Sequence, residues 1–189
     1  IYSFLHHKIK KKIIFLDNLD QRQIENFSKN KLSKNNLFIV VSKSGNTIET
    51  ITNLNLIKKN KLNSSNTIVI TEKKQNALNK FAKKENILTI EHKNFIGGRY
   101  SVLSEVGMVP AYLMGLNISK IRKNLLFFMK ESKRMFLAKS ISKISQIYLS
   151  KKINLIIFFN YCPELDDFVF WCQQLIAESL GKQKKGLMP

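Results

Sequence analysis

This chain of 189 residues is poor in cysteine and acidic residues and has no long hydrophobic run. Its two cysteines, Cys162 and Cys172, are too few for a disulfide framework and too isolated for a metal site. The longest apolar run, at residues 155–159, is strand-sized and falls far short of the roughly eighteen residues that span a bilayer. The first residues lack the apolar core of a signal peptide. We therefore expect a reduced, cytoplasmic protein without membrane segments.

The shortage of acidic residues leaves a formal net charge of +19, with 32 Lys and Arg against 13 Asp and Glu. Such a charge favours nucleic-acid binding in principle, because cations that neutralise phosphates release counterions. Here the charge is mostly lysine spread along the chain, beside abundant Asn and Ile, a mixture typical of AT-rich codons. A positive field also attracts anionic sugar phosphates, so the charge does not separate these functions. We expect no nucleic-acid partner, since aromatic interleaving and recognition motifs are missing.

Short β-rich apolar runs alternate with helical patterns through the first half of the chain, as in a parallel sheet flanked by helices. The expected strands are residues 13–16, 37–41, 67–70 and 87–90, and the expected helices are residues 21–32, 47–59 and 75–84. The run at 37–41 has no polar alternation, which indicates a central strand covered on both faces. The pattern predicts an α/β domain.

The second half of the chain is more helical. Residues 104–114 resemble a helix with an irregularity at Pro110, and residues 118–150 form a lysine-rich amphipathic stretch that we interpret as two helices. A fresh strand is expected at 154–159, followed by a helix that begins near Pro163 and runs to about Leu180.

The segment between the strand at 37–41 and the next helix has the composition of a phosphate-binding loop. The hydroxyls of Ser42, Ser44 and Thr47, the charge of Lys43 and the freedom of Gly45 meet at one helix N-terminus. That terminus carries unpaired N–H groups and partial positive charge. An ordinary Ser/Thr cap with a turn glycine remains the alternative for any single residue. The G-x-x-x-x-G-K pattern is absent, which disfavours nucleotide hydrolysis.

Three segments together resemble one enzyme family. Residues 42–50 resemble the phosphate loop of sugar isomerase (SIS) domains, whereas residues 97–104 and 174–182 resemble the two signatures of the glucose-6-phosphate isomerase family. They occur in the family's order with plausible spacing. The resemblance implies isomerisation between glucose 6-phosphate and fructose 6-phosphate through a cis-enediol, in glycolysis and gluconeogenesis, without metal or organic cofactor.

The resemblance also assigns residues to roles. Glu178 matches the family's catalytic base and Arg99 the cation that stabilises the enediolate. Gly98 and Gln174 match sugar-contacting positions, and Ser42, Lys43, Ser44 and Thr47 match the phosphate site. Gln174 precedes Glu178 by one helical turn, so the two should share a face. Taken alone, Glu178 could be a solvated helix-end carboxylate and Arg99 a surface ion pair.

The family fold consists of two three-layer α/β/α units of SIS type, with the active site between them, and the family acts as a homodimer. We expect a first SIS domain at 1–109 without its beginning, connecting helices at 110–150, and the first strand and helix of a second unit at 151–189. The family's catalytic His and Lys have no match in this chain, because His92 lies in the wrong segment.

We therefore expect an internal stretch of the enzyme, inactive alone. The alternative is a noncatalytic SIS module that binds a sugar phosphate and regulates a partner. Such a module would need the phosphate loop but neither Arg99 nor Glu178. A nucleic-acid-binding protein is the third reading.

Overall fold

The computed structural model describes residues 1–29, 36–57, 62–150, 153, 155–181, 186, 188 and 189. These residues form two compact units. The sheet unit is Lys10–Met114, and the helical unit consists of Ile1–Ile9 and Gly115–Pro189.

The sheet unit is built on three parallel strands in the order β1-β2-β3. They are β1 (Phe38–Val41), β2 (Thr67–Thr71) and β3 (Leu88–Glu91). In the register, Val40 pairs with Val69 and Ile70 with Ile90. Parallel neighbours require crossover connections, and helices supply them here. The predicted α/β class with a parallel sheet is confirmed.

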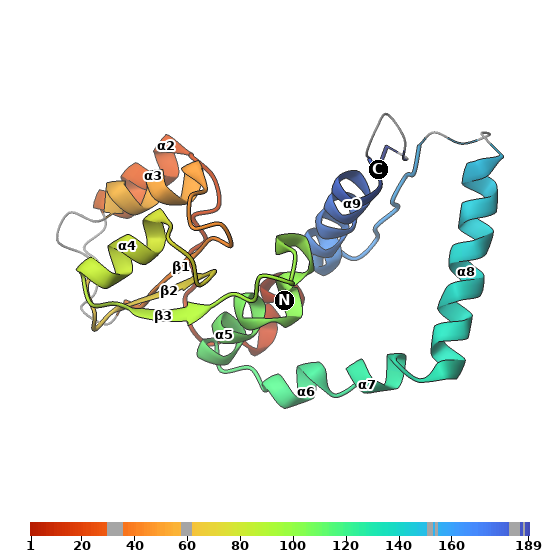
Figure 1. Ribbon diagram of the computed structural model, residues 1–189, viewed down its shortest axis with the longest axis horizontal. Helices are drawn as coiled ribbons and strands as arrows, with labels where there is room; N and C mark the ends of the chain where they lie inside the picture. Colours follow the sequence, from red (N-terminus) through yellow and green to blue (C-terminus); the bar gives the residue numbers. More distant parts are fainter. Residues whose placement is uncertain (30–35, 58–61, 151–152, 154, 182–185, 187) are drawn as a thin grey trace. The chain divides into compact units, whose positions relative to one another are not determined.

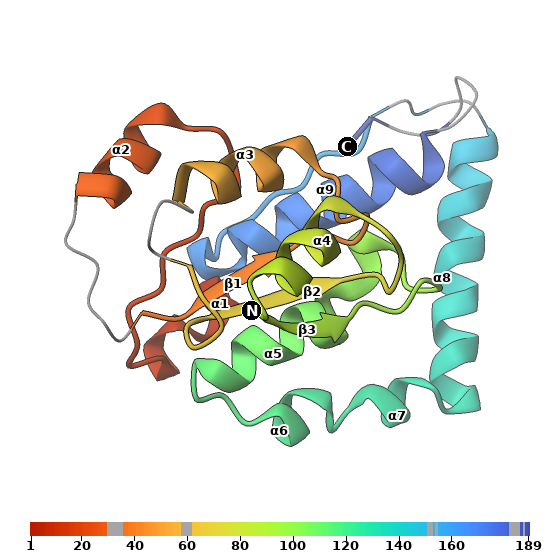
Figure 2. The same cartoon turned by 60° about the vertical axis from the view of Figure 1, so that its left-hand side comes forward.

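Helices cover both faces of this sheet. They are α2 (Gln21–Lys29), α3 (Ile48–Ile57), α4 (Ala77–Lys84) and α5 (Glu105–Leu113), with a 3₁₀ segment η2 at Gly98–Leu103. Figures 1 and 2 show α3 and α4 on one side of the strands and α5 on the other. This is a three-layer α/β/α arrangement.

The main core lies between the sheet and the helices α2, α3 and α4. Val69 of β2 packs there with Leu54 of α3 and Leu78 of α4. Side chains alternate along a strand, so the next residue, Ile70, faces the side of α5. Both Val69 and Ile70 are fully buried, because β2 is the central strand of the described sheet. The expectation that residues 37–41 form the central strand is wrong for this sheet, since β1 lies at its edge and is only half-buried.

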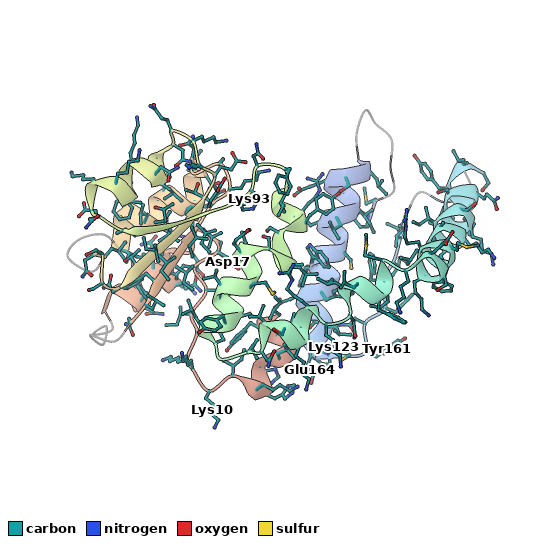
Figure 3. All side chains as sticks on the ribbon, turned by 60° about the horizontal axis from the view of Figure 1, so that its bottom comes forward. Lys10, Asp17, Lys93, Lys123, Tyr161 and Glu164 are labelled. Carbon is teal, nitrogen blue, oxygen red and sulfur yellow. The ribbon has the colours of Figure 1, made fainter. Side chains whose placement is uncertain are left out.

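The helical unit contains short helices and two longer ones. They are α1 (Tyr2–Leu5), η1 (His6–Lys8), α6 (Ile118–Arg122), α7 (Leu125–Phe128), α8 (Glu131–Leu149), η3 (Pro163–Leu165) and α9 (Asp166–Leu180). The Ser3 hydroxyl donates a hydrogen bond to the Glu164 carbonyl at 2.7 Å, which ties α1 to η3 (Glu164 is labelled in Figure 3). The prediction of two helices over 118–150 is wrong, since breaks at Asn124 and Lys130 give three.

The strand expected at 13–16 is not formed. Two of its carbonyl groups accept hydrogen bonds from side chains instead of from a neighbouring strand. Gln23 Nε2 donates to the Phe15 carbonyl at 2.8 Å, and Asn53 Nδ2 donates to the Leu16 carbonyl at 3.3 Å. A segment whose backbone groups are paired in this way has no need of a neighbouring strand.

The strand expected at 154–159 is also wrong for the described residues 155–159. Leu155 makes one isolated parallel bridge with Met188, through a hydrogen bond from Ile156 N to the Met188 carbonyl at 2.8 Å. Ile157 and Phe159 remain exposed. A strand becomes regular only along a continuous partner, and among the described residues this segment pairs through one isolated bridge. The helix after it is confirmed as η3 and α9.

The helices expected at 21–32 and 47–59 correspond to α2 and α3, and their predicted ends at 30–32, 58 and 59 lie outside the described residues. Pro110 lies inside α5, which continues to Leu113. No helix in the described part of the chain combines the length and the apolarity needed to cross a membrane.

Candidate functional site

The loop between β1 and α3 gathers three hydroxyl groups. Ser42 Oγ and Thr47 Oγ1 are 2.7 Å apart, and Ser44 Oγ lies 3.4 Å from the same Thr47 oxygen. Ser42 is buried, whereas Ser44 and Thr47 are exposed. The loop therefore starts at a buried serine and presents two hydroxyls to solvent. It lies directly beyond the carboxyl end of a parallel strand, where α/β sheets bind ligands.

The turn in this loop depends on Gly45. Its φ of +69° lies in the left-handed region, which a residue without Cβ adopts at little cost. Gly45 N donates to Ser42 Oγ at 3.1 Å, and Asn46 N donates to Ser44 Oγ at 3.2 Å. Serine side chains thus cap the backbone of the turn, as Ser commonly does in tight loops.

Helix α3 begins immediately after the turn. Among the described side chains, none accepts a hydrogen bond from the N–H groups of Ile48, Glu49 and Thr50 in its first turn. Unpaired N–H groups and the helix dipole together favour an anion at this position. Combined with the three hydroxyls, the loop has the chemistry to hold a phosphate group.

Lys43 reaches the two neighbouring loops. Its ammonium donates to the Asn94 carbonyl at 3.0 Å and lies 3.5 Å from Glu72 Oε1. Lys74 pairs with the other carboxylate oxygen of Glu72. The hydrogen bond from Lys74 lowers the pKa of Glu72 below its ordinary value, and Lys43 adds to this effect while burial opposes it. Lys43 thereby links the ends of all three strands.

Gly98 and Arg99 lie at the start of η2. The Gly98 carbonyl accepts a hydrogen bond from Ser101 Oγ at 2.6 Å, and the Arg99 guanidinium carbon lies 5.0 Å from the centroid of the Tyr100 ring. Arg99 is half-buried and Gly98 is exposed. The segment is anchored by Ser101, which is buried, so that a 3₁₀ turn carries the arginine.

Gln174 and Glu178 lie together on α9 in the helical unit. Gln174 Nε2 donates to Glu178 Oε1 at 2.8 Å, and both side chains are exposed. The predicted sharing of one helix face is therefore observed. A hydrogen bond of this kind fixes the direction of one oxygen of the carboxylate.

The sequence prediction missed Asn76, Glu72 and Asn94. Asn76 directly precedes α4 and accepts a hydrogen bond from Asn79 N at 2.8 Å, which is the N-cap signal that Asn gives before a helical run. Glu72 follows β2, so its position at the carboxyl edge of the sheet could have been anticipated. The hydrogen bond to Asn94 uses its backbone carbonyl, which every residue has, so the sequence could not have predicted it.

Metal and thiol chemistry find no support in the described ranges. No group of three or more His, Cys, Asp and Glu side chains within them could hold a metal ion. The Cys162 thiol donates to the Glu164 carboxylate at 3.1 Å, and this hydrogen bond raises the pKa of the thiol. Burial raises the pKa of Cys172.

These features define a class: an α/β/α domain whose parallel sheet ends in a hydroxyl-rich loop at a helix N-terminus. The family model described as phosphoglucose isomerase matches residues 2–186. The chain belongs to the phosphoglucose isomerase family.

Relatives agree with this assignment. The chain is 32% identical over 185 residues to the glucose-6-phosphate isomerase of Methanocaldococcus jannaschii, covering 93% of this chain and 45% of that protein. It is 32% identical over 164 residues to the glucose-6-phosphate isomerase of Staphylococcus saprophyticus, covering 79% and 36%. The chain therefore spans less than half the length of these relatives.

A solved structure has the same fold. The crystal structure of the hypothetical protein TT0462 from Thermus thermophilus matches with a TM-score of 0.80 and 24% identity. The match covers 98% of this chain and 47% of that one.

Proposed function

We propose that this chain supplies the phosphate loop and two catalytic groups of a glucose-6-phosphate isomerase. The observation that carries the proposal is the hydroxyl cluster of Ser42, Ser44 and Thr47 at the start of α3, in a chain of the phosphoglucose isomerase family. A dianionic phosphate accepts hydrogen bonds from hydroxyls and N–H groups of this kind. Lys43 adds a cation beside the loop, and Gly98 provides an exposed backbone position for the sugar.

In the proposed reaction, Glu178 moves a proton between C1 and C2 of the open-chain sugar. The carboxylate removes the proton from C2 of the aldose, and the electron pair of that C–H bond forms the C1–C2 double bond of the enediolate as the negative charge passes to O1. The hydroxyl proton of O2 moves to O1, the C2 carbonyl forms, and the same carboxyl returns its proton to C1 of the ketose. Arg99 stabilises the enediolate oxygen, an interaction that typically contributes about 3 kcal/mol. The hydrogen bond from Gln174 orients Glu178 for this transfer.

The wider assignments rest on the same reasoning. The reaction belongs to glycolysis and gluconeogenesis, in the cytoplasm, and it needs no metal or organic cofactor. We propose a homodimer as the working state. Binding of a sugar phosphate without turnover would instead favour a regulatory SIS module.

Binding is tested on the chain itself. Titration with glucose 6-phosphate and with glucose, followed by isothermal calorimetry, should give a measurable affinity for the phosphate ester and none for the free sugar. Replacing Ser42 by Ala should weaken binding, because this removes a hydroxyl and one of the two acceptors for Gly45 N, leaving only the Ser42 carbonyl. Equal binding of glucose and glucose 6-phosphate would contradict a phosphate site.

Catalysis is tested in a chimera in which residues 1–189 replace their counterpart in the Methanocaldococcus jannaschii relative. The chimera should interconvert the two sugar phosphates, and in deuterium oxide it should place deuterium at the carbon that receives the proton. Glu178→Gln should lower kcat by about 100-fold or more, since a positioned base typically contributes 10²–10⁴-fold. The matched control is Glu164→Gln, an acidic residue of the same unit outside the site. A Glu178→Gln chimera of undiminished kcat would refute the assigned base.

A further inference from the structure

Asn76, which lies 31 positions after Gly45, contacts the β1–α3 loop and restricts its position. Asn76 is only 4% exposed, and both ends of its amide are engaged. Its Oδ1 accepts from Asn79 N at 2.8 Å, whereas its Nδ2 donates to Thr71 Oγ1 at 3.3 Å and to the Glu72 carbonyl at 3.4 Å. The amide group therefore has one fixed orientation.

The fixed amide lies directly against Gly45. A Cβ placed on Gly45 would overlap the amide carbon, oxygen and nitrogen of Asn76. The loop reaches this position because Gly45 has no side chain, so the amide sets how far the turn can move toward the sheet. Since Gly45 is buried, solvent does not separate the two residues.

The first turn of α4 completes the brace. Ala77 N donates to Asn46 Oδ1 at 2.9 Å, and Leu78 N donates to the Gly45 carbonyl at 3.1 Å. Such N–H groups have no partner within their own helix. In this fold they hold the β1–α3 loop, so the N-terminus of α4 supports the loop while the N-terminus of α3 faces the proposed phosphate.

From this arrangement we infer that Asn76 is a positioning residue for sugar-phosphate binding. It touches no substrate in the proposed site. It fixes Gly45, and the Gly45 turn in turn sets the directions of the hydroxyls of Ser42 and Ser44 that cap it. The inference rests on the proposed phosphate site and adds the residue that keeps the site in shape.

The first test separates positioning from stability in the full chain. Asn76→Ser keeps a good N-cap for α4 but removes the flat amide from Gly45. We expect the thermal midpoint to fall no further than in the control variant Asn79→Ala, which also loses two side-chain hydrogen bonds. The affinity for glucose 6-phosphate should fall by about tenfold, as when one charge-assisted hydrogen bond is lost. Inorganic phosphate should show the same loss, because the effect acts on the phosphate group.

The matched control is Asn79→Ala. The Asn79 side chain donates to the Glu72 carbonyl at 2.8 Å and to the Lys74 carbonyl at 2.7 Å, so it supports the same turn. Within the described residues, the side-chain hydrogen bonds of Asn79 do not reach the β1–α3 loop. This variant should lower the thermal midpoint and leave the affinity of the folded chain within about twofold of wild type.

A double-mutant cycle tests the contact itself. Gly45→Ala should weaken binding of glucose 6-phosphate, because the added methyl group displaces the turn. Asn76→Gly removes the overlapped amide and retains a tolerated N-cap residue. The double variant should therefore bind more tightly than Gly45→Ala alone, with a coupling of about threefold or more, as for residues in contact.

The outcomes separate the two proposals. A wild-type chain that binds the sugar phosphate, with Asn76→Ser equally tight and an additive cycle, would overturn the positioning role and leave the phosphate site intact. A wild-type chain that binds neither glucose 6-phosphate nor inorganic phosphate would overturn both. Weaker binding by Asn76→Ser than by Asn79→Ala, at a thermal midpoint no lower than that of Asn79→Ala, together with a coupled cycle, supports the inference.

Discussion

Replacing Gly45 with alanine should lower the free energy of unfolding of the sheet unit, whether or not a ligand is present. A left-handed φ costs a residue with Cβ about 1–2 kcal/mol, and here φ is +69°. The new methyl group would also overlap the side chain of Asn76, which is buried and hydrogen-bonded. Overpacking of this kind typically costs about 1–3 kcal/mol. Alanine restricts the unfolded chain and returns roughly 0.4–1 kcal/mol.

The balance is a loss of roughly 1–5 kcal/mol in the free energy of unfolding of the sheet unit, with a midpoint near 3 kcal/mol. Two other glycines of this unit serve as controls that separate the cost of steric overlap from the cost of the left-handed φ. Among the described residues, no atom outside the chain neighbours of Gly98 lies within 4 Å of an added Cβ, so Gly98→Ala should change stability by less than about 0.5 kcal/mol. Gly107 lies inside α5, where an added Cβ would overlap the Val102 carbonyl without a left-handed φ. Gly107→Ala should cost about 1–3 kcal/mol from overlap alone.

Hydrogen exchange is the appropriate assay, because unfolding followed over the whole chain would mix the two units. Amides of β2 at Val69 and Ile70 are fully buried and should exchange through opening of the sheet unit. A loss of about 3 kcal/mol raises their exchange rate by roughly 100-fold. If β2 in Gly45→Ala exchanged as slowly as in Gly98→Ala, neither the strained φ nor the contact with Asn76 would describe the protein in solution.

Two further predictions concern the polar contacts of the sheet unit. Glu72→Gln should lower the free energy of unfolding at pH 7, because the pKa of this carboxyl is lower in the folded chain than its ordinary 4.5; such a group stabilises above that value and stops doing so as the pH falls through its folded pKa. Followed by hydrogen exchange of the buried β2 amides, the difference between wild type and Glu72→Gln in the free energy of unfolding should therefore persist from pH 7 to 5 and shrink below 4.5, and a constant difference at all pH values would refute it. Asn53→Ala should cost about 1–3 kcal/mol and expose residues 13–18 to protease, since Asn53 Nδ2 donates to the Leu16 and Asn18 carbonyls. Asn53→Asp, which keeps the shape but not the donor, should be cleaved as readily, and protection of either variant would count against this contact.

The sequence predicts the β1–α3 loop well because its signals are local. An apolar run, a hydroxyl-rich turn with Gly45 and a following helix occupy consecutive residues, and each has its own propensity. The Gln174–Glu178 pair is equally local, one helical turn apart. By contrast, the contact between Gly45 and Asn76 joins residues from two different crossover connections. A single sequence gives the cap at Asn76 but not the loop against which it lies.

The two incorrect strands fail for a related reason. Residues 13–16 have the β-branched and aromatic composition of a strand. The carbonyls of Phe15 and Leu16, however, accept hydrogen bonds from side chains of the helices α2 and α3. Residues 155–159 have the same composition, and Leu155 finds one bridging partner. Strand propensity measures fit to a half-buried pleated surface, so it cannot decide which backbone groups a tertiary neighbour will pair.

The pairing of charges at the sheet's carboxyl edge bears on the competing functions. Lys43 and Lys74 both pair with Glu72, and Lys93 pairs with Glu91 at 2.8 Å. Lysines near the loop are thus partly neutralised by adjacent carboxylates, which weakens the field that a nucleic-acid backbone would meet there. Hydroxyl and N–H donors keep their directionality whatever the net charge. Selectivity at this loop should therefore follow the geometry of one phosphate group, and the net charge of +19 would act mainly on the rate of encounter.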